Sequence, residues 1–551
     1  MMSYPEVLIV GAGVAGMTVA YELTRRGHLV TVVEFGPVPD PKTEFLTETW
    51  PDELPERGLG RGGAEYYPTA HFTSRRNAPY VIGTEVANSW LKRTRVVGGK
   101  TLYWTGHALR FSDVEFQAVS TTGQGENWPI TSAELTPFYK RAEQLMGVCG
   151  SFEGLSHQPD GEFLPPLELR PGERILQKAL AAHHIPLIPA RKAILTRNFG
   201  HRPACHFAGR CYLGCRTGAK FDAYTGLTQA ALQTGKLTLR PDSVVTEVLS
   251  NPAGQAMGVR LINRKTRKVE VLNAKIVVLA ASAIETARIL LNSKSPGKRY
   301  SLANQSGLIG HYLTESIGVL VEGLLPQLKG TPVGDITSTG EHGLIPRWVN
   351  LSRTSQESYS DGFLFLVESG PGSFPTYAAQ LPGFGKSLKQ AIQDWYPAAI
   401  RLYGIAPVTA RRDNRVIVDP RHRDEWGIPT AKVVFSLSEE DGLRWQAMTA
   451  SAQEFLELAG AEYITVRQKG PETGGGLHAA GTCRMGNDPK TSVVTSFGQC
   501  HDVPNLFVAD AATFVTSLNQ PTLTVMALAL RQAEFIGNQV PGSGFRVPGS
   551  G

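Results

Sequence analysis

The stretch VLIVGAGVAGMTVAYELTRRGHLVTVVE, residues 7–34, decides the fold at the start of the chain. An apolar run, the pattern GxGxxG, a helical stretch and a second apolar run ending in an acid follow one another as in a βαβ unit. Gly11 permits the tight turn, Gly13 lets the backbone approach a pyrophosphate, and Gly16 allows close helix–strand packing. The helix N-terminus offers N–H groups to phosphates, and Glu34 can accept both ribose hydroxyls. Because an acid at that position repels a 2′-phosphate, the stretch predicts a site for FAD or NAD rather than NADP.

Two further stretches near the C-terminal half repeat this order of elements. KIVVLAASAIETARILLNS, residues 275–293, predicts a buried strand, a turn of small residues and a helix. In NLFVADAATFVTSLNQPTLTVMALALR, residues 505–531, a strand over 506–508 precedes an acidic loop at Asp510 and an apolar helix starting just after Pro521. A dinucleotide-binding domain assembled from separated segments is therefore predicted.

The middle of the chain is predicted to form a second domain built on a sheet. Strand-like runs fill residues 315–470, where neither a phosphate loop nor a metal-ligand spacing occurs. Residues 127–147 predict a helix with an N-terminal capping box, and residues 236–271 predict three antiparallel strands. By composition, residues 37–90 predict surface loops and residues 541–551 a flexible tail.

Composition excludes several classes of function. The chain has 551 residues, 42% apolar and 19% charged, as expected of a globular protein of about two domains. The net charge of +6 is mild and its lysines and arginines are dispersed, so no nucleic-acid partner is predicted. No apolar run approaches the roughly 18 residues of a membrane span. The chain enters a strand almost at once, which predicts a cytoplasmic protein, or a periplasmic one if it is exported together with a partner.

Three of the six cysteines lie close together: Cys205, Cys211 and Cys215. Soft thiolates at this spacing favour a metal centre over a disulfide, and three ligands suit a [3Fe–4S] cluster. A zinc site completed by His201 or His206, or a set of reduced structural cysteines, stays open as an alternative.

Several motifs, taken together, resemble the glucose–methanol–choline (GMC) oxidoreductase family. They are the N-terminal fingerprint, VVGGKTLYW at 96–104, VVLAASAIETARILL at 277–291, DEWGIP at 424–429, and HAAGTCRMG at 478–486 with its downstream strand and helix. Within the family the chain is most similar to pyranose oxidases, FAD-dependent glucose dehydrogenases and glucoside 3-dehydrogenases. The cysteine segment also looks like the cluster-binding stretch of the glucose dehydrogenases, with a spacing that differs by one residue.

The resemblance implies an α/β fold (α+β overall), in which a Rossmann-like FAD-binding domain is interleaved with a sheet-based substrate-binding domain. Residues 1–112, 200–312 and 475–540 are expected in the first domain, and residues 113–199 and 313–474 in the second. It also implies a sugar or glycoside substrate, whose secondary hydroxyl at C2 or C3 is oxidised to a ketone by hydride transfer to flavin N5.

The resemblance further implies roles for individual residues. His478 matches the family's catalytic base, and a neutral histidine suits proton abstraction near pH 7. Its partner is expected just before the terminal PTLT, where Gln520 matches by spacing and Asn519 by residue type. The expected FAD contacts, besides the fingerprint glycines and Glu34, are Ala15, Gly98, Gly99, Tyr103, Trp104, Ala281, Asp510, Ala511, Pro521 and Thr522.

The mode of flavin attachment and the electron acceptor follow from the same comparison. Tyr103 stands where pyranose oxidases carry the histidine that bonds covalently to FAD, so non-covalent FAD is predicted, with His107 as an alternative tether. With the cluster present, electrons would pass to an external acceptor or a partner subunit; without it, to O2. The alternatives are an oxygen-reducing pyranose or glycoside oxidase, an NAD-dependent dehydrogenase, and a non-catalytic flavin electron-transfer subunit.

Overall fold

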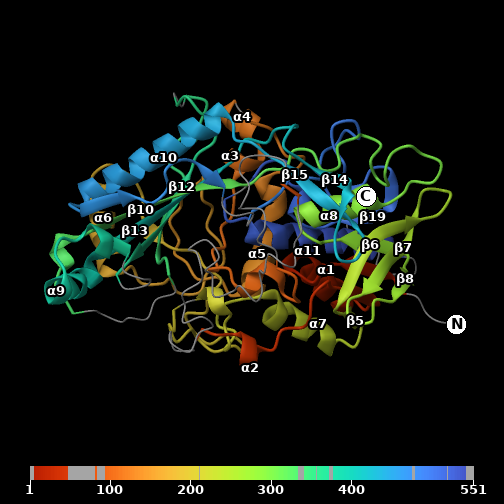
Figure 1. Cartoon of the computed structure of the whole chain (residues 1–551), viewed down its shortest axis with the longest axis horizontal. Helices are drawn as coiled ribbons and strands as arrows, with labels where there is room; N and C mark the ends of the chain where they lie inside the picture. The colour runs from red at the N-terminus through yellow and green to blue at the C-terminus, as the bar shows by residue number, and fades with distance from the viewer. Residues whose placement is uncertain are drawn as a thin grey trace.

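A six-stranded sheet in the order β18–β19–β9–β1–β2–β5 joins segments that are far apart in the sequence (Figure 1). Its strands are β1 (Val7–Val10), β2 (Val30–Val33), β5 (Leu237–Arg240), β9 (Ile276–Leu279), β18 (Gln499–Cys500) and β19 (Val503–Val508). All neighbours are parallel except β18 and β19. Every residue of β1, β2 and β9 is buried, as expected for a parallel sheet covered on both faces, and this explains their continuous apolar runs.

The computed structural model describes residues 5–47, 81–82, 94–123, 125–209, 211–332, 340–354, 357–370, 376–473, 478–517 and 519–540. Most of the loops predicted over 37–90, and the predicted tail at 541–551, lie outside these residues. No helix of the described chain is both long and apolar enough to cross a membrane.

Three helices pack together beside the parallel sheet: α1 (Val14–Arg25), α5 (Ser132–Met146) and α11 (Thr522–Gln539). The helix predicted within 127–147 is confirmed as α5, including the capping box between Thr131 and Glu134. The predicted strand, turn and helix over 275–293 are confirmed as β9 followed by α8 (Ala283–Asn292).

The prediction of three antiparallel strands over 236–271 was wrong at its beginning. The strands β6 (Ser243–Ser250), β7 (Ala256–Asn263) and β8 (Val269–Asn273) do form an antiparallel sheet. The run before them, however, is β5, which pairs in parallel with β2. Pro241, which has no N–H to donate to a ladder, and Asp242, with a left-handed φ of 52°, separate the two strands.

A second, antiparallel sheet forms the opposite half of the molecule in Figure 1. Its strands are β4 (Ile188–Pro189), β10 (Ser316–Leu324), β11 (Gly343–Ile345), β12 (Leu364–Ser369), β13 (Ala399–Pro407), β16 (Glu462–Val466) and β17 (Glu472–Thr473). The helix α10 (Glu439–Leu458) packs on β10 and β13 and also contacts α6 (Pro171–Ala181). No helix was predicted at α10, although Ser438 and Asp441 form a capping box at its start.

The remaining elements described here are a small sheet and several shorter helices outside the two large sheets. A small sheet contains β3 (Val81–Ile82), β14 (Arg415–Arg423) and β15 (Pro429–Val434). The shorter helices are α2 (Pro41–Glu44), α3 (Asp113–Phe116), α4 (Ala118–Thr122), α7 (Gln229–Gln233) and α9 (Gly385–Trp395). The combination of a parallel sheet with helices and a second sheet is the predicted α/β (α+β) class. The domain boundaries stay a prediction.

Candidate functional site

Two glycine turns face one another at the N-terminus of α1. Gly11 has a left-handed φ of 107°, and a Cβ there would lie 2.3 Å from the Ala280 carbonyl oxygen. The Gly98 N–H donates to the Ala12 carbonyl at 2.8 Å, and a Cβ on Gly99 would approach Gly13 Cα to 3.1 Å. No side chain caps the helix at Gly13, so its first N–H groups are open to a ligand. These turns form a backbone cradle that fits the pyrophosphate of a dinucleotide.

Glu34 lies beside this cradle with its carboxylate buried. One carboxylate oxygen accepts the Ala12 N–H at 2.9 Å and the other accepts the Gly36 N–H at 3.0 Å. Burial outweighs these hydrogen bonds and the charge of Arg95, and raises the pKa of Glu34 to about 7. Each oxygen keeps a lone pair, so the carboxylate can still accept hydroxyl groups of a ribose.

Asp510 joins the ends of the neighbouring parallel strands β9 and β19. Its Oδ2 accepts the Ser282 N–H at 2.8 Å and the Thr286 hydroxyl at 2.6 Å, and its Oδ1 accepts the Ala512 N–H at 2.8 Å. Burial raises the pKa of Asp510 above its usual value. The carboxylate thus fixes the turns that contain Ala281 and Ala511 at the carboxyl edge of the sheet, where ligands of open α/β sheets bind.

The turn at Tyr103 and Trp104 is held by a buried lysine that sequence analysis missed. The Lys220 ammonium donates to the carbonyls of Thr101, Leu102 and Trp104 at 3.3, 2.9 and 3.0 Å. Trp104 donates its indole N–H to the Phe221 carbonyl at 2.7 Å. Lys220 follows the cysteine segment directly, but nothing in its spacing indicates three carbonyl acceptors more than a hundred residues earlier.

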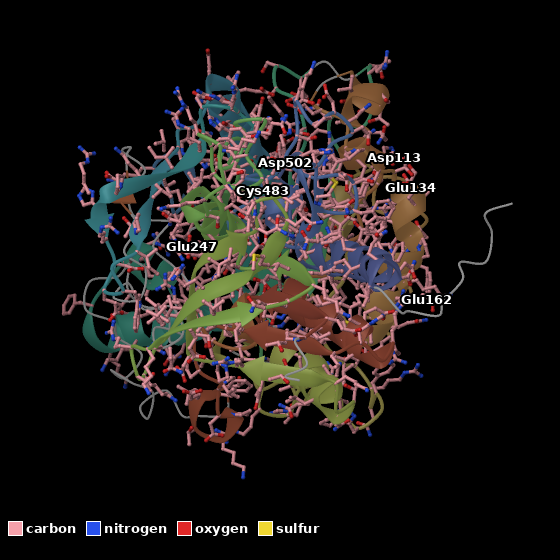
Figure 2. All side chains as sticks on the ribbon, turned by 90° about the vertical axis from the view of Figure 1, so that its right-hand side faces the viewer. Asp113, Glu134, Glu162, Glu247, Cys483 and Asp502 are labelled. Carbon is pink, nitrogen blue, oxygen red and sulfur yellow. The ribbon has the colours of Figure 1, made fainter. Side chains whose placement is uncertain are left out.

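His478 starts a loop that pairs with η10 (Ala511–Thr513) on one side and with the segment before β10 on the other. The N–H of Cys483, for example, donates to the Ala512 carbonyl at 2.7 Å. Cys483 is fully buried and lies well inside the outline of the molecule, whereas Glu162 lies at its edge (Figure 2). The loop is therefore anchored in the interior next to the carboxyl edge of the parallel sheet.

The His478 side chain is oriented by Glu315 and Ser316, two residues that sequence analysis also missed. The backbone N–H of His478 donates to Glu315 Oε1 at 2.8 Å, and the ring atom Nδ1 lies 2.8 Å from Ser316 Oγ. Ser316 Oγ is 3.4 Å from the same Glu315 oxygen, so the hydroxyl can donate to the carboxylate while it accepts Nδ1–H. Nε2 makes no hydrogen bond to any described residue.

Desolvation sets the protonation state of this imidazole. His478 is partly exposed, yet burial, with a smaller contribution from the Lys100 charge, lowers the pKa of the imidazole to about 4. The imidazole is therefore neutral near pH 7. A neutral ring with Nδ1 occupied presents Nε2 as a proton acceptor.

The two amides before Pro521 are placed differently. Asn519 lines a cavity together with Ser517, and its buried Oδ1 has no hydrogen-bond partner within the described part of the chain. Gln520 has a left-handed φ of 59°, a backbone conformation that costs a non-glycine residue free energy and displaces the chain at this point. Of the two amides, Asn519 is the one that faces the cavity. Pro521 is the N-cap of α11 and Thr522 its first residue.

The cysteine cluster does not support the predicted iron–sulfur or zinc site. Among the described residues, no group of three or more His, Cys, Asp or Glu side chains is arranged to hold a metal ion. The Sγ atoms of Cys205 and Cys215 instead accept backbone N–H groups of Phe207 and Lys220, each at 3.3 Å. Burial raises the pKa of Cys205 to about 12, so this sulfur is a thiol near neutral pH.

Comparison with known proteins relates the chain to a family of enzymes. Two family models, both described as GMC oxidoreductase, match residues 189–315 and 410–529, and a model described as FAD dependent oxidoreductase matches residues 6–43. The chain is 30% identical to the 2-methyl-1,2-propanediol dehydrogenase of Mycolicibacterium austroafricanum, over 97% of this chain and 95% of that one. It is 26% identical to the fructose dehydrogenase large subunit of Gluconobacter japonicus, over 97% and 98% of the two chains.

The fold has a close solved counterpart. The pyridoxine 4-oxidase of Mesorbium loti superposes with a TM-score of 0.65 at 18% sequence identity, covering 96% of this chain and 99% of that one. At this identity the likeness concerns the fold. The relative that is 30% identical over nearly the whole chain, together with the family models, establishes that the chain is a member of the FAD-dependent GMC oxidoreductase family.

Proposed function

We propose that this enzyme oxidises a secondary hydroxyl group, at C2 or C3 of a sugar or glycoside, to a ketone. The observation that carries the proposal is the neutral His478 imidazole, whose Nδ1 is held by Ser316 while no described residue hydrogen-bonds to Nε2. A sugar-oxidising relative of nearly the same length, the fructose dehydrogenase large subunit, supports the substrate class.

The cradle residues are proposed to hold FAD without a covalent bond. Gly11, Gly13 and Gly99 leave room for the pyrophosphate, and Glu34 accepts the ribose hydroxyls. Tyr103 is proposed to contact the flavin rather than to tether it, since its phenol accepts a hydrogen bond from the Thr94 hydroxyl at 3.0 Å. When bound, FAD supplies the hydride acceptor, N5 of its isoalloxazine ring.

Proton removal is assigned to the chain's own residues. His478 Nε2 accepts the proton of the substrate hydroxyl as the hydride leaves the same carbon. The Asn519 amide orients that hydroxyl through its Nδ2–H donors. Asp510 acts through the backbone turns that it fixes, because its carboxylate is already bonded to three protein donors. We propose that the reduced enzyme passes its electrons directly to O2 or to a small diffusible acceptor.

The test uses anaerobic reduction of the purified yellow protein by a panel of sugars and glycosides, with the product located by mass spectrometry after borodeuteride reduction. His478→Ala is expected to lower the rate of flavin bleaching by about 100- to 10,000-fold while FAD stays bound. The control is His183→Ala, which changes an exposed histidine. Rapid bleaching in His478→Ala, or no bleaching of the wild-type protein by any sugar, would contradict the proposal.

A further inference from the structure

The cavity beside Asn519 has more charge in its wall than recognition of a neutral hydroxyl requires. Its wall includes Asn519 and Ser517 from the segment before α11. It also includes four titratable side chains: Glu115, His157, Arg347 and Asp361. Burial, with a smaller contribution from Arg347, lowers the pKa of His157, so this ring is neutral near pH 7. The charges that face the cavity are therefore one guanidinium and two carboxylates.

The guanidinium is committed to the protein. Arg347 donates through Nε to the Val349 carbonyl at 3.1 Å and through a terminal nitrogen to the Asn350 carbonyl at 2.5 Å. Its other terminal nitrogen lies 3.5 Å from Glu115 Oε1. The remaining Glu115 oxygen accepts the N–H and the hydroxyl of Ser112 at 3.0 and 3.1 Å. Arg347 and Glu115 therefore balance one another, and neither is directed chiefly to a ligand.

Asp361 is left as the unbalanced charge. Asp361 lines the cavity, and its carboxylate makes no hydrogen bond or ion pair with any described residue. The backbone of Asp361 is nevertheless fixed: its carbonyl accepts the Asn350 side-chain N–H at 2.5 Å and its φ is 58°. At the next residue, Gly362, a Cβ would lie 2.5 Å from Arg347 Nε, so only glycine allows this close packing. Asp361 is partly exposed, so its carboxylate is solvated in the free enzyme and is available to pair with a positively charged ligand.

Unpaired acceptors in the same wall point to a ligand. Ser517 is only 4% exposed, and its hydroxyl has no hydrogen-bond partner among the described residues. The same part of the chain offers no hydrogen-bond partner to the buried Asn519 Oδ1 and His157 Nε2 atoms. Leaving such groups unpaired costs about 1–3 kcal/mol each, a cost that a ligand with several N–H or O–H donors removes.

We propose that the cavity binds the ammonium group of an amino sugar, with Asp361 as its counter-ion and with Ser517 and Asn519 as further acceptors. An ammonium carries three donors, which match these three groups in number. A carboxylate ligand is disfavoured because Asp361 faces it and the donors of Arg347 are occupied. A divalent cation is disfavoured because, within the described chain, no group of three such ligands forms. The inference rests on the proposed oxidation of a sugar and specifies which sugars are preferred.

The test compares kcat/KM for three glycosides that differ only at C6 and keep the C2 and C3 hydroxyls: methyl 6-amino-6-deoxy-β-D-glucoside, its N-acetyl derivative and methyl β-D-glucoside. The amine is expected to be preferred over both neutral compounds by about 10- to 100-fold, the contribution of a hydrogen bond to a charged group. Asp361→Asn is expected to bring the ratio close to one. The matched control Asp413→Asn, which changes a carboxylate that is 59% exposed and paired with Arg411, is expected to keep the wild-type ratio.

The outcomes separate this inference from the proposed function. Equal kcat/KM values for the amine and the neutral glycosides in the wild-type enzyme would overturn the amine assignment while leaving sugar oxidation in place. A preference that persists in Asp361→Asn would overturn the role of Asp361. If none of the three glycosides, nor any other sugar, bleaches the flavin, the proposed function itself fails. The wild-type comparison with the N-acetyl derivative keeps the test decisive if Asp361→Asn does not fold.

Discussion

Removing the Ser316 hydroxyl tests how the proposed base is prepared for proton abstraction. In the structure Oγ lies 2.8 Å from His478 Nδ1 and 3.4 Å from Glu315 Oε1. When the hydroxyl donates to the carboxylate, it accepts Nδ1–H, and the Nε2 lone pair is then free for the substrate. Ser316 and Glu315 thus act as positioning residues that select the imidazole tautomer.

The magnitude follows from what Ser316→Ala takes away. It removes one hydrogen bond of ordinary length, about 1 kcal/mol, and the link from the ring to a buried carboxylate, which contributes up to about 2 kcal/mol more. The ring is then free to rotate or to carry its proton on Nε2. The rate constant of flavin reduction is expected to fall roughly 10- to 100-fold, since about 1.4 kcal/mol corresponds to tenfold.

The assay is anaerobic stopped-flow reduction of the bound flavin by a sugar that the wild-type enzyme oxidises, measured from pH 4 upward. Because the pKa of His478 is lowered to about 4, the base is neutral above that pH, and the rate falls only as pH drops through this region. Ser316→Ala is expected to lower the plateau at every pH rather than to move the acid limb upward. Ser387→Ala, which removes an exposed hydroxyl bonded to the Phe384 carbonyl, serves as the control. A plateau equal to that of the wild type, or a loss fully explained by missing FAD, would refute the reasoning.

Four further predictions concern the remaining parts of the site. Burial raises the pKa of Glu34 to about 7, and ribose hydroxyls favour its ionised form, so FAD affinity is expected to rise as pH increases through 7. Isothermal titration calorimetry is expected to find no such rise in Glu34→Gln. Asn519→Ala is expected to slow flavin reduction about tenfold, whereas Gln520→Gly, which relieves a left-handed φ, is expected to retain activity. If Gln520→Gly were slow and Asn519→Ala fully active, the role of partner to His478 would belong to Gln520. Lys220→Met is expected to reduce the free energy of unfolding by about 3 kcal/mol in urea titrations, since three buried carbonyls lose their donor. Iron and acid-labile sulfide assays of anaerobically purified protein are expected to find no iron; about three irons per flavin would restore the cluster prediction.

The predictable part of the site was encoded locally. The turn at Gly11 needs only its own backbone conformation and its neighbour across the sheet, so GxGxxG between two apolar runs was enough to find it. The start of α5 could also be predicted, because a capping box is formed by residues three positions apart. The strand β5 was misassigned because alternation alone does not tell which sheet a strand joins.

The unpredicted residues act across long separations. Glu315 meets His478 only because the segment before β10 pairs with a loop more than 160 residues later. Lys220 and Asp361 likewise depend on packing between distant segments. No periodicity or spacing in the sequence indicates such contacts. The clustered cysteines illustrate the reverse case, in which a suggestive spacing was not matched by the arrangement of the side chains.

The order of strands in the parallel sheet has a consequence for synthesis of the protein on the ribosome. Strand β1 lies between β2 and β9, and β9 pairs on its other side with β19, which ends at Val508. The nascent chain therefore exposes one edge of β9 until nearly the whole polypeptide has emerged, and α11, which packs on α1, emerges later still. Closing loops of this length makes the sheet slow to form. The turn at Asp510 and the helix α11, which complete the proposed cofactor site, are therefore among the last segments to be synthesised, and prematurely terminated chains are expected to present an open apolar sheet edge.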